Sequence, residues 1–248
     1  MILLFTDFGY DGPYVGQMHA VLAQQAPGIP VIDLMHDAPA HDPRAGAYLL
    51  AALAAEFPDG AVCVAVVDPG VGGTRPPVVL EADNRTYVGP GNGLFELVQR
   101  RAGSAQQSRI KWRPPRLSDS FHGRDLFAPV GAMLARGEAP SLDPYEDGWR
   151  DDPARPGGDW PDDLPEVIYA DRFGNLVTGL RDGAIGPDAI IDLDGHAIRY
   201  ARVFADAPAD TPFWYVNSMG LIEIAVANGS AAARLDAAPG TTVTVTAP

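Results

Sequence analysis

Three short polar motifs contain the residues best suited to chemistry. TDFG (6–9) and DPGVGGTR (68–75) each follow an apolar run, and FHGRD (121–125) precedes a helical pattern. An aspartate directly after a first strand often binds ligand hydroxyls, because a carboxylate can accept two hydrogen bonds from a ribose diol. The glycines of the second motif let the backbone approach a ligand closely, but the motif lacks the GK[ST] ending of a phosphate-binding loop. We therefore expect a small-molecule site of another kind.

Two of these motifs contain a charged pair and a histidine. Asp68 and Arg75 are seven residues apart on the glycine-rich loop, where an ion pair would orient the carboxylate. Spacing alone favours a structural salt bridge for this pair. A lone histidine such as His122 is also more often packed or exposed than catalytic. These residues alone support two interpretations: a catalytic group or a structural polar network.

Other histidines leave a metal site open as an alternative. His36, His41 and Asp42 lie close together in LMHDAPAHD and are possible ligands. No histidine pair has the HExxH spacing, however, and the chain has no CxxC motif. A loop between a strand and a helix explains this segment equally well. A metal-dependent hydrolase is therefore the second hypothesis that the residues support.

The elements that must position these motifs alternate between strands and helices. Apolar runs at 2–6, 31–34 and 62–67 predict strands, and helical spacing at 14–25 and 44–57 predicts helices. This alternation predicts an α/β domain with a mainly parallel sheet flanked by helices, and ligands bind at the carboxyl ends of such strands. Two more strands are expected at 78–82 and 85–89, joined by an Asp83–Asn84 turn, with helices at 93–101 and 126–136, the second disturbed by Pro129.

The second half of the chain has a different pattern. Residues 137–165 hold six prolines and seven aspartates without periodicity, which predicts a linker or an irregular wrapping segment. We then expect a smaller all-β domain, an antiparallel barrel or sandwich, over 166–248. The α/β domain would span 1–136. The strands expected in the β-domain are 166–171, 175–180, 189–193, 197–204, 213–218, 221–227 and 241–247, with a turn at Asp194–Gly195.

Bulk properties exclude several classes of partner. The formal net charge of −14 offers no basic footprint for nucleic acid, although it could steer a cationic ligand. No apolar run approaches the roughly 18 residues that a membrane span needs. The single cysteine, Cys63, cannot form an internal disulfide and lies in an apolar run typical of a buried thiol. We therefore predict a cytoplasmic protein that binds neither nucleic acid nor membrane.

Taken together, seven motifs along nearly the whole chain resemble the S-adenosyl-L-methionine (SAM) hydroxide adenosyltransferase family. Relatives of this family include the SAM-dependent fluorinase and chlorinase. Each motif is weak alone, but seven in order are highly specific. The motifs are TDFGYDGPYVGQMHAVL (6–22), IDLMHDAPAHDPRAGAYLL (32–50), VVDPGVGGTR (66–75), YVGPGNGLF (87–95), FHGRDLFAPV (121–130), IYADRFGNLVTGL (168–180) and VNSMGLIEIAVANG (216–229).

The resemblance implies a fold, an assembly and a reaction. Family members have an N-terminal α/β domain and a C-terminal β-domain. They form homotrimers, with the substrate between the N-terminal domain of one subunit and the C-terminal domain of the next. The hydroxide branch carries an Asp–Arg–His triad, and Asp68, Arg75 and His122 stand at its positions. Halogenases have tyrosine at the positions of Asp68 and His122, and a fluorinase has serine at Gly123. The chain thus resembles a hydrolase that forms adenosine and L-methionine, with SAM as substrate and no metal or other cofactor.

The resemblance also implies substrate contacts. Asp7 would bind the ribose hydroxyls, Asp171 the methionine amino group, Asn175 the adenine edge and Ser218 the amino-acid end, while Phe121 and Phe173 would contact the substrate. Two positions depart from the relatives. Gly12 replaces an aspartate, with Asp11 one place earlier, and Met219 replaces the fluorinase arginine that grips the methionine carboxylate. We therefore expect another form of carboxylate recognition, through backbone N–H groups.

The expected chemistry is attack of water at C5′ with methionine leaving as a neutral thioether. Asp68 or His122 would take the proton from water, and Arg75 would orient Asp68 and keep it ionised. Which of the two is the base stays open. The alternatives are a SAM-dependent halogenase, the metal-dependent hydrolase, and a non-catalytic trimer that binds SAM or adenosine.

Overall fold

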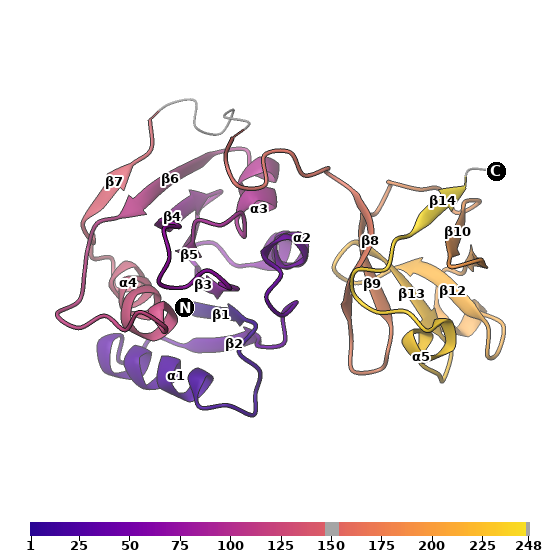
Figure 1. Cartoon of the computed structure of the whole chain (residues 1–248), viewed down its shortest axis with the longest axis horizontal. Coiled ribbons are helices and arrows are strands. Elements are labelled where there is room, and N and C mark those ends of the chain that lie inside the picture. Colours follow the sequence, from indigo (N-terminus) through magenta and orange to yellow (C-terminus); the bar gives the residue numbers. More distant parts are fainter. Residues whose placement is uncertain (147–153, 247–248) are drawn as a thin grey trace. The chain divides into compact units, whose positions relative to one another are not determined.

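The computed structural model describes residues 1–146 and 154–246. The chain divides into two compact units, Met1–Asp159 and Trp160–Pro248. Each unit is built on one seven-stranded sheet with helices, and Figure 1 labels the elements along the chain. Two domains were predicted and are present, but the second is one curled sheet with a helix rather than an all-β barrel or sandwich.

The N-terminal sheet is mixed, so the expectation of a mainly parallel sheet was wrong. Its strand order is β2-β1-β3-β5-β4-β6-β7. The pairs among β2, β1, β3 and β5 are parallel, whereas β5–β4, β4–β6 and β6–β7 are antiparallel. The strands are β1 (Ile2–Thr6), β2 (Val31–Met35), β3 (Val62–Val66), β4 (Pro77–Ala82), β5 (Arg85–Pro90), β6 (Ala105–Ile110) and β7 (Leu142–Pro144).

A tight turn explains the change of direction. Asp83 and Asn84, the predicted turn, both have left-handed φ angles of 46° and 62°. Two such residues form the hairpin turn that joins antiparallel neighbours, because its twist matches that of the strands. A parallel neighbour would require a long crossover instead. The sheet therefore turns antiparallel from β4 onward.

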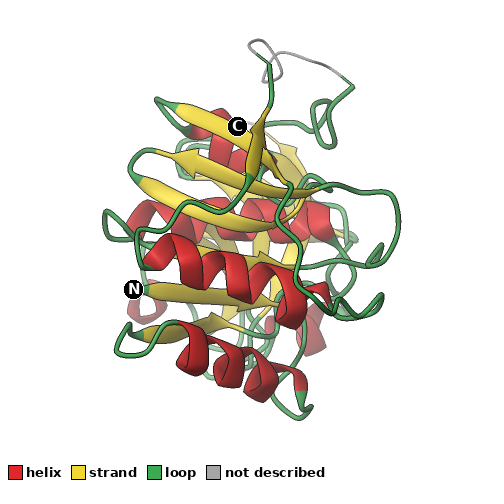
Figure 2. Cartoon of the chain, turned by 90° about the vertical axis from the view of Figure 1, so that its left-hand side faces the viewer, coloured by secondary structure: helices red, strands yellow, loops and turns green. Residues whose placement is uncertain are grey.

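Helices cover both faces of this sheet, as Figures 1 and 2 show. The helices are α1 (Tyr14–Gln25), α2 (Pro43–Leu53), continued by a 3₁₀ turn (Ala54–Glu56), α3 (Glu96–Arg101) and α4 (Ala128–Ala135), the last preceded by a π-helical turn (Gly123–Phe127). Pro129 lies in the first turn of α4, directly after the π-helical turn, so the helical segment is irregular next to this proline but continues through it. None of the helices in the described part of the chain has the length and apolar composition needed to cross a bilayer.

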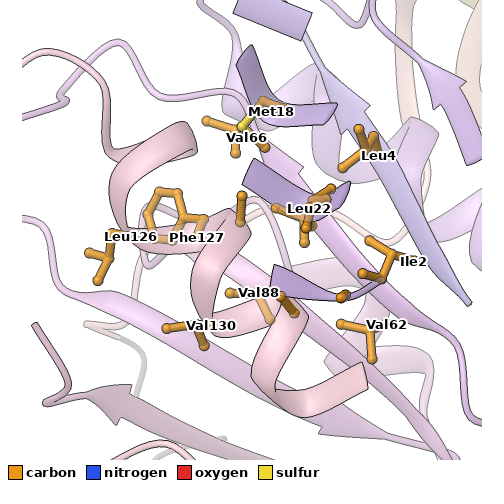
Figure 3. Close-up of a cluster of buried hydrophobic side chains, with 14 of the residues drawn as sticks. Ile2, Leu4, Met18, Leu22, Val62, Val66, Val88, Leu126, Phe127 and Val130 are labelled. Carbon is orange, nitrogen blue, oxygen red and sulfur yellow. The ribbon is translucent and has the colours of Figure 1, made fainter. Parts of the chain in front are cut away.

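One apolar core joins α1 and α4 to the central strands. Every residue of β1 and β3 is buried, as expected for strands covered on both faces. Cys63 lies inside β3, and its burial raises the pKa of the thiol. Figure 3 shows this core, whose labelled side chains are Ile2, Leu4, Met18, Leu22, Val62, Val66, Val88, Leu126, Phe127 and Val130. The carboxyl ends of β1 and β3 are thus held rigidly.

The C-terminal unit is a curled, largely antiparallel sheet with the order β14-β10-β11-β12-β13-β9-β8. Only β11–β12 is parallel among its described strand pairs. The N–H of Val167 donates to Thr241 and that of Val243 donates to Pro165, so the chain before β14 pairs with β8. The elements are β8 (Leu164–Ala170), β9 (Leu176–Arg181), β10 (Ile190–Leu193), β11 (His196–Tyr200), a 3₁₀ turn (Phe204–Asp206), β12 (Pro212–Val216), β13 (Leu221–Val226), α5 (Ala231–Leu235) and β14 (Thr244–Thr246).

Several elements were not expected from the sequence. β6 and α5 were missed, and β7 lies inside the segment predicted as a linker. Part of that linker prediction, residues 147–153, and the last predicted strand residue, 247, lie outside the described residues. The Asp194–Gly195 turn is present, with φ angles of 52° and 85°.

Candidate active site

The three polar motifs of the N-terminal domain meet at one cavity. Its volume is about 260 Å³, and Asp7, Asp68, Phe121 and His122 all line it. The strand pairing explains how the two aspartates come together. β1 and β3 are parallel neighbours, with Thr6 opposite Val66, so Asp7 and Asp68 follow adjacent strand ends.

Asp68 and Arg75 form a buried ion pair. Their side chains are only 4% and 10% exposed. The Arg75 Nε donates to both Asp68 oxygens at 3.0 Å, and its terminal nitrogen donates to Asp68 Oδ2. The Arg75 guanidinium also lies 5.2 Å from the ring centre of Phe127. Because a planar guanidinium binds a carboxylate in one fixed orientation, this contact fixes how Asp68 faces the cavity.

The same arginine determines the protonation of His122. An Arg75 terminal nitrogen lies 2.9 Å from His122 Nδ1. A guanidinium can only donate hydrogen bonds, so Nδ1 must accept and carries no proton. Burial, together with the charge of Arg75, lowers the pKa of His122 from its ordinary value of 6.5. His122 is therefore neutral at pH 7, with its proton on Nε2.

Tight packing holds the loops that carry this triad. Gly72 has a φ of +77°, and a Cβ there would lie 2.4 Å from the backbone oxygen of Asp119. Asp125 accepts a hydrogen bond from the Ser118 N–H at 2.9 Å and two from Arg124. The π-helical turn after His122 also varies the helical repeat at this point, as often occurs at functional sites.

Asp7 is oriented by the segment that had been considered for a metal. The N–H of His41, a residue with a φ of 59°, donates to Asp7 Oδ2 at 3.0 Å. His36 is fully buried and contacts Thr6 through Nδ1 and Asp33 through Nε2. Asp42 caps α2 by accepting from the Ala45 N–H. Across residues 1–146 and 154–246 no group of three or more histidine, cysteine or acidic side chains could hold a metal ion, so these three residues do not assemble into the alternative site.

An aromatic wall completes this cavity; the sequence predicted Phe121 as one of its residues but missed Phe8 and Tyr14. Phe8, Tyr14 and Phe121 contact one another with ring centres 5.2–5.9 Å apart, and all three line the cavity. Tyr14 opens α1 and is exposed over 48% of its surface, unlike the core aromatics. The signal in the sequence is an aromatic residue at a helix start directly after the Asp7 loop. Such a wall suits a planar, apolar ligand face.

The C-terminal domain contains the other predicted substrate residues. Asp171, Phe173, Asn175 and Ser218 line a cavity of about 910 Å³ in this unit. Asp171 accepts hydrogen bonds from the N–H groups of Phe173 and Asn175 and from the Asn175 side chain. Phe173 is 68% exposed. The four predicted residues are thus gathered at one surface, with Asp171 and Asn175 bonded to each other.

A buried carboxylate in this cavity was also missed. Glu223 is only 6% exposed, accepts from the Tyr215 hydroxyl, and accepts from Asn217 Nδ2 at 2.8 Å. Burial and the contact with Glu223 raise the pKa of Tyr215, so this hydroxyl stays a donor. The signal lies in the strand LIEIAV (221–226), where a lone glutamate interrupts an apolar run. A charge in such a place is buried only when it is bonded, which marks it as a site residue or a structural tie.

Comparison with known protein families identifies the family to which both domains belong. Residues 2–142 match the SAM hydroxide adenosyltransferase N-terminal domain, and residues 165–244 match the corresponding C-terminal domain. The chain belongs to the SAM hydroxide adenosyltransferase family. The family resemblance expected from the seven motifs is thereby confirmed.

Individual known proteins are similar to this one over almost the whole chain. An (R)-S-adenosyl-L-methionine hydrolase of Thermus thermophilus is 39% identical over 93% of this chain and 93% of its own. A Salinispora arenicola protein of the same name is 37% identical, covering 98% and 96%. The crystal structure of an uncharacterized conserved protein from Thermotoga maritima has a TM-score of 0.83 at 26% identity and covers 99% of both chains.

Proposed function

We propose that this protein hydrolyses (R)-S-adenosyl-L-methionine to adenosine and L-methionine. Water attacks C5′, the C5′–S bond breaks, and its electron pair leaves with sulfur as the neutral thioether of methionine. The observation that carries the proposal is the Asp68–Arg75–His122 contact at the wall of the Asp7 cavity. Names of relatives at 37–39% identity support the same reaction.

The proton of the attacking water passes to Asp68 in this proposal. His122 Nδ1 already accepts from Arg75, so the other ring nitrogen carries hydrogen and can only donate. His122 therefore orients water through its Nε2–H, while the carboxylate of Asp68 is the acceptor that remains in the triad. Opposite charges are neutralised as a hydroxide-like oxygen attacks the carbon next to a sulfonium. A pocket that excludes water favours such a step. We propose Asp68 as the base for this reason, a choice that the sequence leaves open.

The remaining roles follow the family resemblance and are part of the same proposal. Asp7, held by the His41 N–H, binds the ribose hydroxyls, and Phe121 packs against the nucleoside. In the C-terminal cavity, Asp171 binds the methionine ammonium, Asn175 and Phe173 contact the adenosine part, and Ser218 meets the amino-acid end. We also propose a homotrimer located in the cytoplasm, with no metal or other cofactor in the reaction.

One assay tests this function against its alternatives. Protein treated with a chelator is incubated with each sulfonium epimer of SAM, with and without chloride and fluoride, and the products are separated by chromatography. Equal amounts of adenosine and methionine from the (R) epimer, independent of halide, are expected. A 5′-halo-adenosine would make the protein a halogenase, and activity that returns only with added metal would make it a metallohydrolase. Bound but intact SAM would leave a binding protein.

A further inference from the structure

The cavity of the C-terminal domain offers a ligand no cationic side chain. Across the described residues, neither lysine nor arginine lines it, whereas two carboxylates do, those of Asp171 and Glu223. Glu223 is almost fully buried, so water screens its charge poorly. A positive ligand group gains from this field and a negative one loses. The carboxylates of the cavity therefore favour an ammonium group and oppose a carboxylate.

Backbone N–H groups near Ser218, the carboxylate partners expected from the sequence, are mostly engaged. The side chain of Asn217 accepts from the Met219 N–H at 2.9 Å and from the Leu221 N–H at 3.1 Å, and its carbonyl accepts from the Gly220 N–H at 3.0 Å. Glu223 fixes the Asn217 amide in this orientation by accepting from its Nδ2. The N–H groups of Met219, Gly220 and Leu221 are thus engaged within the turn. The uncharged hydroxyl of Ser218 can accept a hydrogen bond from the ammonium at the amino-acid end.

Within the described residues, the cavity at Asp7 and Asp68 is also lined by no lysine or arginine that could bind the substrate carboxylate. Its lining contains two aspartates and two histidines. Arg75 is committed to Asp68 and His122. Neither cavity therefore provides the charged partner that would make a carboxylate a requirement for binding.

We propose that the carboxylate of SAM is not a recognition element, and that the protein also hydrolyses sulfonium nucleosides lacking it. The substrate class is adenosyl sulfonium compounds with an alkyl ammonium arm, represented by decarboxylated SAM. Its amine is the same number of bonds from sulfur as that of SAM. Water attacks C5′, the C5′–S pair leaves with sulfur, and one proton is released, giving adenosine and 3-(methylsulfanyl)propylamine. This inference rests on the proposed function of the same site.

The loss of kcat/KM on removing the carboxylate distinguishes a site that binds this group from one that does not. A site that hydrogen-bonds a polar substrate group rejects an analogue lacking it by roughly 10⁴-fold, because its own buried groups are left unpaired. Without such recognition, removal of the carboxylate changes the arm only slightly in apolar contact. We expect kcat/KM for decarboxylated SAM to lie within about tenfold of that for SAM, a range typical of small apolar differences.

The test compares kcat/KM for SAM and decarboxylated SAM in the same preparation, by adenosine release. Comparable values support the proposal. Hydrolysis of SAM with a loss of hundredfold or more for the decarboxylated compound overturns it and leaves the proposed function intact. Hydrolysis of neither compound overturns both.

Three variants sharpen this comparison. Met219→Arg supplies the missing cation and is expected to raise the preference for SAM at least tenfold, whereas Met219→Leu leaves the ratio of the two substrates unchanged. The guanidinium of Arg172 lies 5.6 Å from the ring centre of Phe173, which lines the cavity. A contact of Arg172 with the carboxylate must therefore be tested. Arg172→Ala is expected to leave the ratio unchanged. A selective loss of SAM hydrolysis in that variant would show that Arg172 binds the carboxylate and would contradict the proposal.

Discussion

At the scale of single residues, one arginine holds the proposed catalytic triad together. Arg75 orients Asp68 and, through Nδ1, fixes the tautomer of His122. The triad residues could be named from the sequence because the family motifs carry them. The division of roles could not be, since it depends on which ring nitrogen Arg75 meets. Glu223 was missed for a related reason: a lone acid in a strand shows nothing of the Tyr215 and Asn217 that bond it.

Asp68→Asn tests the proposed base. The amide keeps the size of the side chain but cannot take a proton from water, so kcat is expected to fall by roughly 10²- to 10⁴-fold. The dissociation constant for SAM, measured by calorimetry, should change little. Asp143→Asn is the matched control, because that side chain is 56% exposed on β7. Equal kcat values for Asp68→Asn and wild type would remove Asp68 from the mechanism.

The pH dependence of kcat reports on His122. Its pKa is lowered below 6.5, so the neutral form that accepts from Arg75 predominates above pH 6.5 and is lost as pH falls through the lowered pKa. We expect kcat to decline on the acidic side with a midpoint below 6.5. His122→Asn retains an acceptor for Arg75 but cannot titrate, so this decline should disappear. His19→Asn, at a histidine bonded to Asp33 instead, should keep it. An unchanged profile in His122→Asn would exclude His122 as the titrating group.

At the scale of elements, strong periodicity was enough to find most of the fold. The predicted helix 14–25 and strand 2–6 match α1 and β1 residue for residue, since the first carries apolar residues at helical spacing and the second is an unbroken apolar run. β6 was missed because AQQSRI is polar and buries only Ser108 and Ile110. β7 ends in a proline, which an edge strand tolerates, so its sequence reads as a linker. α5 has a Ser230 cap but spans only five residues.

The mixed sheet could not be foreseen from periodicity. A parallel and an antiparallel strand that are both covered on two faces show the same apolar run. The predicted Asp83–Asn84 hairpin already requires an antiparallel pair, yet it does not say where that pair joins the sheet. That β4 lies between β5 and β6 follows from long-range pairing alone.

Gly72→Ala tests the loop that carries the triad. A Cβ at this position would meet the Asp119 oxygen at 2.4 Å, and the left-handed φ adds strain. Gly28→Ala is the matched control, since its φ is +80° but nothing lies within 4 Å. We expect the control to cost about 1–2 kcal/mol of unfolding free energy and to keep its kcat. Gly72→Ala should lose more stability and also lower kcat, as measured by denaturant unfolding and the SAM assay. Matching losses in the two variants would show that the contact with Asp119 is unimportant.

At the scale of the whole molecule, charge is the clearest feature. The formal net charge of −14 attracts a cationic substrate over distances that salt shortens. Raising ionic strength from about 0.02 to 0.5 M should therefore lower kcat/KM for SAM several-fold and leave kcat unchanged. Sucrose at matched viscosity controls for slower diffusion. A kcat/KM independent of salt would show that the charge has no part in substrate capture.

The assembly predicted from the family resemblance is also testable at this scale. Light scattering coupled to size exclusion should give three times the chain mass of 26.3 kDa. A mass of one chain at micromolar concentration would contradict the homotrimer.

Attack of water at C5′ transfers the oxygen of water to adenosine, so the reaction can be followed in oxygen-18 water. Protein treated with a chelator is incubated with SAM in the enriched water, and both products are analysed by mass spectrometry. Adenosine labelled at the 5′ oxygen, together with unlabelled methionine, is the predicted result. Unlabelled adenosine, or SAM that is bound but never cleaved, would contradict it.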